Sequence, residues 1–163
     1  EAVEGMQYVN GAVLLIIGDG DILEKVKRSV QELKLGEKVI FRKKVPFSEL
    51  KQYTANASIG ISLDKDTNIN YRYSLPNKIF DYVHAGIPVL ASNLVEIRKI
   101  FSKHDIGEMI ESHVPRHIAG KMNAMLSDGE RYKVWKSNCL AASKEFCWEN
   151  EEKVLAGIYS PLL

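Results

Sequence analysis

The short stretch Gly18-Asp19-Gly20 has the composition of an anion-binding turn. It directly follows an aliphatic run, and its two glycines let the backbone approach a ligand closely. Free amides at a turn between a strand and a helix, together with the helix dipole, favour a negatively charged group. The stretch lacks the third glycine of a dinucleotide fingerprint, so a plain tight turn is the alternative interpretation.

The most informative stretch runs from Ser74 to Val89 and is typical of a helix that leads into a strand. Pro76 suits the first turn of that helix, where its missing N–H costs nothing, with Ser74 or Leu75 at the capping position. Gly86 is expected to end the helix. The entrance of the helix is therefore fixed by its sequence.

Lys78 and Asp81 place a cation and an anion on one side of this helix, since residues three apart share a helix face. A helix N-terminus with Ser74 and Lys78 suits a diphosphate, and the Asp81 carboxylate suits the vicinal hydroxyls of a ribose, which need an acceptor. The alternative is an ordinary solvated pair, worth roughly a few tenths of a kcal/mol. Arg72, just before the helix, is either a phosphate contact or a solvated loop cation.

The histidines and cysteines form no recognisable site. No histidine has ligand spacing with an acidic residue or a cysteine, so no metal site is predicted. His84 lies near the end of its helix, where a histidine suits the negative end of the dipole. Cys139 and Cys147 are eight residues apart in a helical region, and we expect both to stay reduced.

Alternating strands and helices must position these residues. Strands are predicted at residues 13–17, 39–41, 59–63, 88–91 and 107–110, and helices at 22–33, 48–57, 76–86, 95–101 and 117–126. Strands this apolar need cover on both faces, which predicts a doubly wound, Rossmann-like parallel sheet with helices on both sides. Residues 130–145 and 149–159 read as two closing helices. Ligands of such sheets bind beyond the carboxyl ends of the strands, where the stretches above lie.

Composition narrows the class of protein. The 163 residues include 22 Lys and Arg against 21 Asp and Glu, a formal charge of +1, which excludes a dominant role in binding nucleic acid. With 45% hydrophobic residues the chain suits one globular domain. Its longest aliphatic run, residues 12–17, is far shorter than the roughly 20 residues of a membrane helix.

Four segments resemble the C-terminal domain of a glycosyltransferase of the GT-B fold, in the retaining family 4 group also called group 1. They are LLIIGDGD, VIFRKKV, SLPNKIFDYVHAGIPVLAS and FCWENEEKVLAGIY, of which the third is the most specific. Together they span residues 13–159. The resemblance implies that residues 1–163 are the donor nucleotide-sugar-binding domain of a larger two-domain enzyme, truncated at the N-terminus, with residues 1–10 as a helix remnant.

The resemblance also assigns roles to single residues. Many family members carry two glutamates with seven residues between them, and the second binds the donor ribose; here those positions hold Tyr73 and Asp81. Asp81 keeps the charge, whereas Tyr73 cannot replace a carboxylate near the sugar. The positions assigned to the diphosphate are Ser74, Lys78, Gly18 and Gly20, and those assigned to the vicinity of the nucleobase are Lys43, Lys44 and Val45.

The activity implied is transfer of a sugar from a nucleotide diphosphate sugar to a glycan or lipid-linked acceptor, with retention, in polysaccharide biosynthesis. The catalytic residues are not identified and are expected in the missing N-terminal acceptor domain, so the isolated chain is expected to be inactive. No cofactor is expected, because the nucleotide sugar is itself a substrate of the reaction. No metal is expected either. The location implied is cytoplasmic, and peripheral association of the full-length protein with the inner face of the membrane stays open.

Two other functions fit parts of the pattern. A nucleotide-sugar epimerase of the GT-B fold would share the donor cleft. A non-catalytic doubly wound module, such as a phosphorylated receiver, would need clustered acids after the first strand, where Asp19 stands alone.

The closing segment has an apolar face that we expect to dock partly on the missing domain. Its apolar residues are Trp148, Val154, Leu155, Ile158, Tyr159, Leu162 and Leu163.

Overall fold

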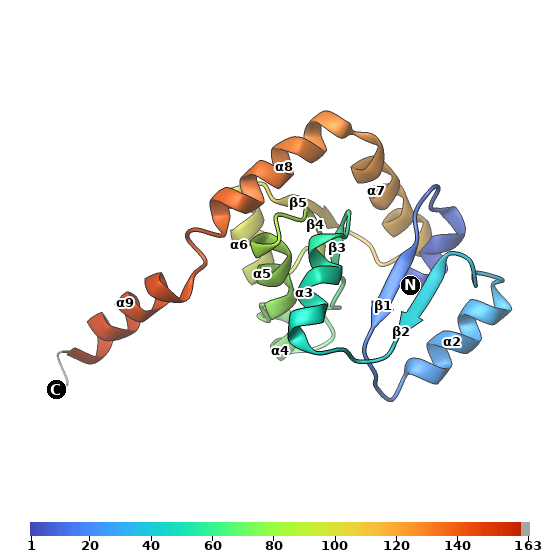
Figure 1. The fold of residues 1–163 in the computed structure, drawn as a ribbon, viewed down its shortest axis with the longest axis horizontal. Helices are drawn as coiled ribbons and strands as arrows, with labels where there is room; N and C mark the ends of the chain where they lie inside the picture. Colours follow the sequence, from blue (N-terminus) through green and yellow to red (C-terminus); the bar gives the residue numbers. More distant parts are fainter. Residues whose placement is uncertain (161–163) are drawn as a thin grey trace.

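The computed structural model describes residues 1–160 and has the predicted alternation of strands and helices (Figure 1). Leu162 and Leu163 of the closing segment lie outside the described residues. The strands are β1 (Leu14–Ile17), β2 (Val39–Arg42), β3 (Gly60–Ser62), β4 (Val89–Ser92) and β5 (Gly107–Ile110). All five lie where aliphatic runs predicted them.

The helices also follow the predicted periodicity. They are α1 (Ala2–Gly5), α2 (Leu23–Glu32), α3 (Phe47–Ala55), α4 (Ile69–Arg72), α5 (Asn77–His84), α6 (Val95–His104), α7 (Pro115–Ser127), α8 (Gly129–Ala142) and α9 (Trp148–Tyr159), with a 3₁₀ turn, η1, at Met6–Tyr8. The unpredicted one is α4, which begins inside the polar loop because the side chain of Asn68 accepts a hydrogen bond from the Tyr71 amide.

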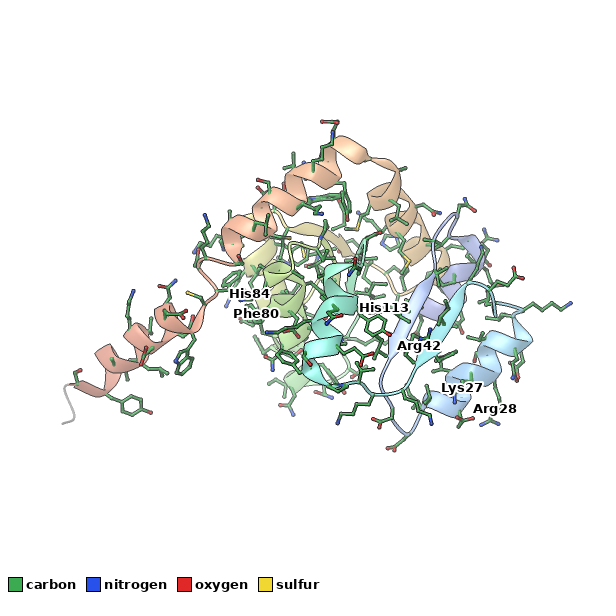
Figure 2. All side chains as sticks on the ribbon, viewed as in Figure 1. Lys27, Arg28, Arg42, Phe80, His84 and His113 are labelled. Atoms are coloured by element: carbon green, nitrogen blue, oxygen red, sulfur yellow. The ribbon has the colours of Figure 1, made fainter. Side chains whose placement is uncertain are left out.

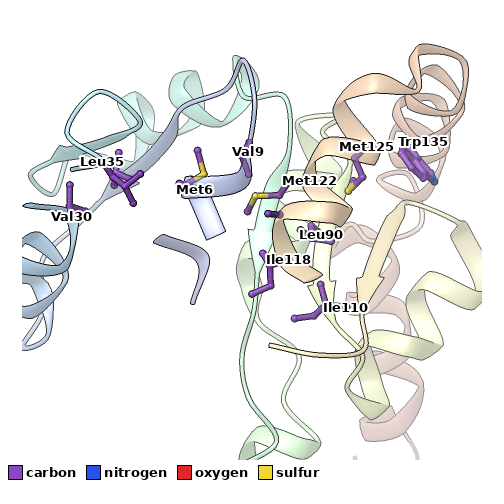
Figure 3. Close-up of a cluster of buried hydrophobic side chains, with 12 residues drawn as sticks. Met6, Val9, Val30, Leu35, Leu90, Ile110, Ile118, Met122, Met125 and Trp135 are labelled. Atoms are coloured by element: carbon purple, nitrogen blue, oxygen red, sulfur yellow. The ribbon is translucent and has the colours of Figure 1, made fainter. Parts of the chain in front are cut away.

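Neighbouring residues of β4 pack on opposite faces, as a doubly wound fold requires. Leu90 belongs to a buried cluster with Ile118 and Met122 of α7, which also includes residues of α2 (Figure 3). Val89 and Ala91 belong to a second cluster, built with residues of α5, α6 and α8. Helices therefore cover both faces, which confirms the predicted fold class.

The strands form two parallel sheets in place of a single one. One pairs β1 with β2, and the other has the order β3-β4-β5. A cavity of about 760 Å³ separates them and is lined by residues of both β1 and β3. Leu15 of β1 and Ile40 of β2 stay 39% and 41% exposed, so this part of the sheet is less buried than its aliphatic sequence predicts.

The junction between α8 and α9 is anchored on the second cluster. The Phe146 ring packs edge-on against Phe80 of α5 and His104 of α6, at centroid distances of 5.3 and 4.9 Å. Cys139 of α8 lies fully buried nearby, and burial raises its pKa to about 12. Both cysteines are free thiols. Beyond Phe146, α9 extends away from the body of the molecule (Figure 1), and none of its residues is buried.

Candidate functional site

The turn after β1 needs both of its glycines. Gly18 and Gly20 have φ angles of +138° and +151°, a region that side chains disfavour. The Gly18 amide donates to the Arg42 carbonyl at 3.1 Å, and the Gly20 carbonyl accepts from the Leu23 amide at 3.0 Å. No atom lies within 4 Å of where a Cβ would stand at either glycine. The turn therefore leaves open space at the carboxyl end of β1.

The loop after β2 presents two exposed cations beside this turn. Lys43 and Lys44 are exposed, and Val45 is half-buried. Among residues 1–160 neither ammonium forms an ion pair. Arg42, at the end of β2, lies at the same end of the molecule as Lys27 and Arg28 of α2 (Figure 2). Lys27 is paired with Glu24, so the cations of this corner without an ion pair among residues 1–160 include Lys43 and Lys44.

The N-terminus of α5 differs in detail from the prediction. Pro76 is the N-cap residue and not part of the first turn, because its ψ of 130° is extended and the helix begins at Asn77. The Ser74 hydroxyl donates to the Tyr71 carbonyl at 2.9 Å, so α4 takes the hydroxyl that was expected to cap α5. The Ile79 amide donates to the Pro76 carbonyl at 3.1 Å, and since α5 has no side-chain cap, the amides of Asn77 and Lys78 stay available to a ligand.

Lys78 pairs with an acid that sequence reasoning did not assign to the site. Its ammonium lies 3.4 Å from Oδ2 of Asp64, and the buried Ser62 hydroxyl donates to the same oxygen at 3.2 Å. Ser62 ends β3, and Asp64 follows two residues later. The signal that could have found this pair is a polar residue ending an aliphatic strand, followed at once by an acid.

Asp81 faces a cavity between α3 and α5. The cavity has a volume of about 480 Å³, and it is lined by Phe47, Leu50, Lys51, Thr54, Ala55, Asp81, His84 and Ala85. Asp81 is exposed and forms no ion pair with Lys78 or any other cation among the described residues. Its carboxylate is free to accept hydrogen bonds from a ligand. Phe47, an exposed ring in the same lining, was not assigned to the site from the sequence.

The residues before α5 hold each other in place. The Arg72 Nε donates to both carboxylate oxygens of Asp66 at 3.1 Å, so this cation is already paired within the loop. Tyr73, at the C-cap of α4, is exposed. Ser74, Lys78 and Asp81 therefore lie along one short segment, but Ser74 contacts Tyr71, Lys78 contacts Asp64, and Asp81 lines the cavity.

The histidines contact the protein itself. The His84 Nε2 lies 2.6 Å from the Phe146 carbonyl oxygen and joins the end of α5 to the α8–α9 junction (Figure 2). The His113 Nε2 lies 3.1 Å from the hydroxyl of Ser92, at the carboxyl ends of β4 and β5. Within residues 1–160, no group of three or more His, Cys, Asp or Glu side chains lies close enough to hold a metal ion.

A family model described as "Glycosyl transferases group 1" matches residues 1–140. No curated protein sequence matches the chain with significance. No helix within residues 1–160 combines the length and apolar character of a membrane span.

Several solved structures share the fold over nearly the whole chain. The glycosyltransferase WaaG, involved in lipopolysaccharide biosynthesis, is 14% identical with a TM-score of 0.75, covering 94% of this chain and 41% of WaaG. Anabaena Alr3699/HepE, solved with UDP and glucose, is 13% identical with a TM-score of 0.80, and the match covers 98% of this chain and 44% of HepE. Sucrose-phosphate synthase from Thermosynechococcus elongatus is 18% identical with a TM-score of 0.81, and the match covers 99% of this chain and 42% of the synthase. The chain thus spans less than half the length of each.

Proposed function

Because the chain belongs to the group 1 glycosyl transferases, we propose that it is the donor-binding domain of a larger enzyme. That enzyme transfers a sugar from a nucleotide diphosphate sugar to a glycan or lipid-linked acceptor, with retention. The acceptor site and the catalytic residues lie outside residues 1–163 in this proposal. Its support is that the chain spans 41%, 44% and 42% of WaaG, HepE and sucrose-phosphate synthase.

The observation that carries the proposal is the Asp81 carboxylate in the cavity between α3 and α5. The volume of about 480 Å³ is within the range of roughly 300 to 1,000 Å³ that small-molecule sites have. A carboxylate with no ion-pair partner among the described residues can accept two hydrogen bonds from vicinal hydroxyls, as a ribose presents them. The larger cavity between the sheets has no charged residue in its lining and does not suit a nucleotide.

The diphosphate of the donor would lie at the N-terminus of α5. The uncapped amides and the helix dipole favour an anion there, and Lys78 adds a full charge. To bind the diphosphate, Lys78 would leave Asp64, which is partly buried and keeps its hydrogen bond from Ser62. Gly18 and Gly20 leave open space at the same edge.

The chemistry at this end of the donor is electrostatic. Negative charge grows on the leaving diphosphate as the glycosidic bond breaks, and fixed amides with Lys78 stabilise that charge without a metal. Arg72 joins them if the phosphate displaces Asp66. The nucleobase would lie near Lys43, Lys44 and Val45, with the exposed Phe47 ring as a stacking surface.

The proposed cellular location of the enzyme follows from its donor and its acceptor. A nucleotide diphosphate sugar is a cytoplasmic metabolite, and free cysteines suit that compartment. We therefore place the enzyme in the cytoplasm, in polysaccharide biosynthesis. A lipid-linked acceptor would bring it to the inner face of the membrane.

A thermal-shift panel with UDP-, GDP- and ADP-sugars tests the proposal on the 163-residue chain. One nucleotide class should raise the melting temperature, since a ligand that binds only the folded state stabilises it. Asp81→Ala should reduce that shift at the same ligand concentration. Glu130→Ala removes an exposed carboxylate on α8, away from the cavity, and should leave the shift unchanged. If no nucleotide shifts the parent chain, the proposal fails.

A further inference from the structure

Two opposite charges line the cavity between α3 and α5 without pairing with each other. Lys51 belongs to its α3 wall and Asp81 to its α5 wall. Within residues 1–160, neither charge has an ion-pair partner. A ligand that fills the cavity can therefore meet an ammonium on one wall and a carboxylate on the other, without first breaking an ion pair of the protein.

Other polar side chains of this lining are already engaged with the backbone. The Thr54 hydroxyl donates to the Leu50 carbonyl at 3.0 Å, one turn earlier in α3. The His84 Nε2 lies 2.6 Å from the Phe146 carbonyl oxygen. Lys51 is therefore the polar group of the α3 wall that stays free for a ligand.

The Lys51 ammonium lies over an aromatic ring of the same lining. Its Nζ is 4.7 Å from the centroid of the Phe47 ring, which precedes it by one helical turn. Phe47 is 61% exposed, and a cation–π contact at so open a place is weak. The ammonium can therefore leave the ring for a hydrogen bond with a ligand and still remain beside it.

The ring, the ammonium and the carboxylate gather at the end of the fold where ligands bind. Helix α3 begins shortly after β2, α5 begins after the loop that follows β3, and the two helices lie side by side (Figure 1). Phe47 is the first residue of α3, and Lys51 and Asp81 lie in the second turns of their helices. All three are therefore near the carboxyl edge of the parallel strands.

The nucleoside of the proposed donor has a group for each of these three features. Its ribose hydroxyls donate to Asp81, and its base stacks on Phe47. An ammonium has three donors and no acceptor, so Lys51 can bind only an acceptor of the base. Uracil has a carbonyl oxygen at C4 and guanine has one at C6, whereas cytosine and adenine have an amine there, which is itself a donor.

We infer that Lys51 selects the nucleobase of the donor and favours a carbonyl at C4 of a pyrimidine or C6 of a purine over an amine. The inference rests on the proposed function, because it needs a nucleotide whose ribose lies at Asp81. When uracil or guanine binds, the ammonium moves from the Phe47 ring to the carbonyl oxygen. With cytosine or adenine it faces another donor and can bind only the ring nitrogens.

The size of the preference follows from the exposure of Lys51. A site that reads a hydrogen-bonding group rejects the analogue without it, because the polar group of the site then loses its partner. Since Lys51 is exposed, water replaces part of that lost bond. We therefore expect a preference of about tenfold, at the lower end of what a hydrogen bond to a charged group gives.

Two matched pairs of nucleotides test the inference on the 163-residue chain. UDP and CDP have a carbonyl and an amine at C4 of the base, and IDP and ADP have the same two groups at C6. Calorimetry measures the four Kd values. In the pair whose ring size the cavity accepts, the Kd of the carbonyl nucleotide should be about ten times lower than that of the amine nucleotide.

Substitutions of Lys51 should remove the preference without removing binding. Lys51→Met removes the donors and should bring the two Kd values of a pair within about twofold, by weakening the carbonyl nucleotide alone. Lys51→Arg keeps a cationic donor and should keep the preference. Because Lys51 is exposed, we expect both variants to fold, and their melting temperatures check this.

The matched control is Lys136→Met on α8. The Lys136 ammonium lies 6.0 Å from the centroid of the Tyr132 ring, at the same spacing in sequence as Lys51 and Phe47, but it does not line the cavity. This variant therefore loses a similar contact elsewhere and should leave all four Kd values unchanged.

The inference is overturned if the parent chain binds both members of each pair equally, prefers the amine, or keeps its preference in Lys51→Met. If Asp81→Ala still weakens binding in that case, the proposed function stands and the base selection alone is wrong. If none of the four nucleotides binds the parent chain, the proposed function itself is contradicted, and the inference with it.

Discussion

Asp81 and Lys78 have different surroundings although they are three residues apart on one helix. Lys78 is paired with Asp64 after β3, whereas Asp81 faces the cavity beside α3 without an ion-pair partner among the described residues. A ligand can therefore bind the Asp81 carboxylate directly, whereas it must displace Asp64 to pair with the Lys78 ammonium. Of the two, Asp81 is the residue whose removal should report most directly on binding.

Substituting Asp81 should weaken nucleotide binding without affecting the fold. A hydrogen bond to a charged group contributes about 1.5 to 3 kcal/mol, so Asp81→Ala should raise the Kd roughly ten- to a hundredfold. Asp81→Glu should keep most of the affinity, because it keeps the charge. Asp81→Asn keeps one acceptor and should lie between. Calorimetry that finds Asp81→Ala as tight as the parent chain would show an ordinary surface acid.

Single residues were predictable where local backbone chemistry decides their role. The glycines of the first turn were predicted from spacing alone, and their positive φ angles agree. The capping role of Ser74 was wrong, because its hydroxyl bonds to α4, a helix too short and too polar to be recognised by periodicity. The Asp64 to Lys78 pair was missed because it depends on how the loop between them folds back.

Among the elements, the β4–β5 pair depends on one glycine. Gly107 lies opposite Val89 with a φ of +154°, and a Cβ there would lie 2.0 Å from the Val89 carbonyl oxygen. Backbone cannot move aside as a flexible side chain can. Contact between β4 and β5 therefore requires the absence of a side chain at this position.

Gly107→Ala should lower the free energy of unfolding by about 3 kcal/mol, since the added methyl group must separate paired strands. The matched control is Gly120→Ala on α7, where a Cβ meets nothing within 4 Å. That substitution should stabilise the chain by up to about 1 kcal/mol through helix propensity. Urea unfolding of both variants measures the difference, and equal midpoints would contradict the packing described.

Helix α9 is the element least supported by the rest of the chain. Trp148 and Ile158 are 64% and 59% exposed, and Val154 and Tyr159 are similarly open. A helix of 12 residues is marginal on its own in water. An apolar face of this kind suits docking on another domain, as the sequence predicted.

In the isolated chain, the amides of α9 should exchange much faster than those of α8, which buries Trp135 and Cys139. In the full-length enzyme they should become protected. If protection in the isolated chain rises with protein concentration, two copies bury the face against each other. Strong protection throughout α9 in a demonstrated monomer would refute the docking role.

Element types were more predictable than their pairing. Aliphatic runs and helical spacing located all five strands, because those patterns are local. The separation into two sheets was not predicted, since no local pattern reports whether β1 finds a neighbour on its second edge. The same limit applies to the cavity between α3 and α5, whose residues come from segments distant in sequence.

At the scale of the whole molecule, the chain should bind the donor without catalysing its turnover. The chain carries the proposed donor residues but spans less than half of each solved structure it matches. We expect the purified chain to bind a nucleotide and to transfer no sugar, because catalysis needs the acceptor side of the cleft. A radiolabelled donor assay measures this. Turnover near ordinary enzyme rates of about 1 to 1,000 per second would contradict it.

Because Cys139 is buried, Cys147 is the cysteine of the native chain that should react with a thiol reagent. Burial raises the pKa of Cys139 to about 12, so its thiol stays protonated at pH 8, and its side chain has no exposed surface. Cys147, only half-buried, is the N-cap residue of α9. A maleimide dye should therefore label the unmodified protein at one position, and Cys147→Ser should abolish the labelling while Cys139→Ser leaves it intact. Fluorescence anisotropy of that dye then measures the motion of α9 relative to the rest of the chain, and no cysteine has to be introduced.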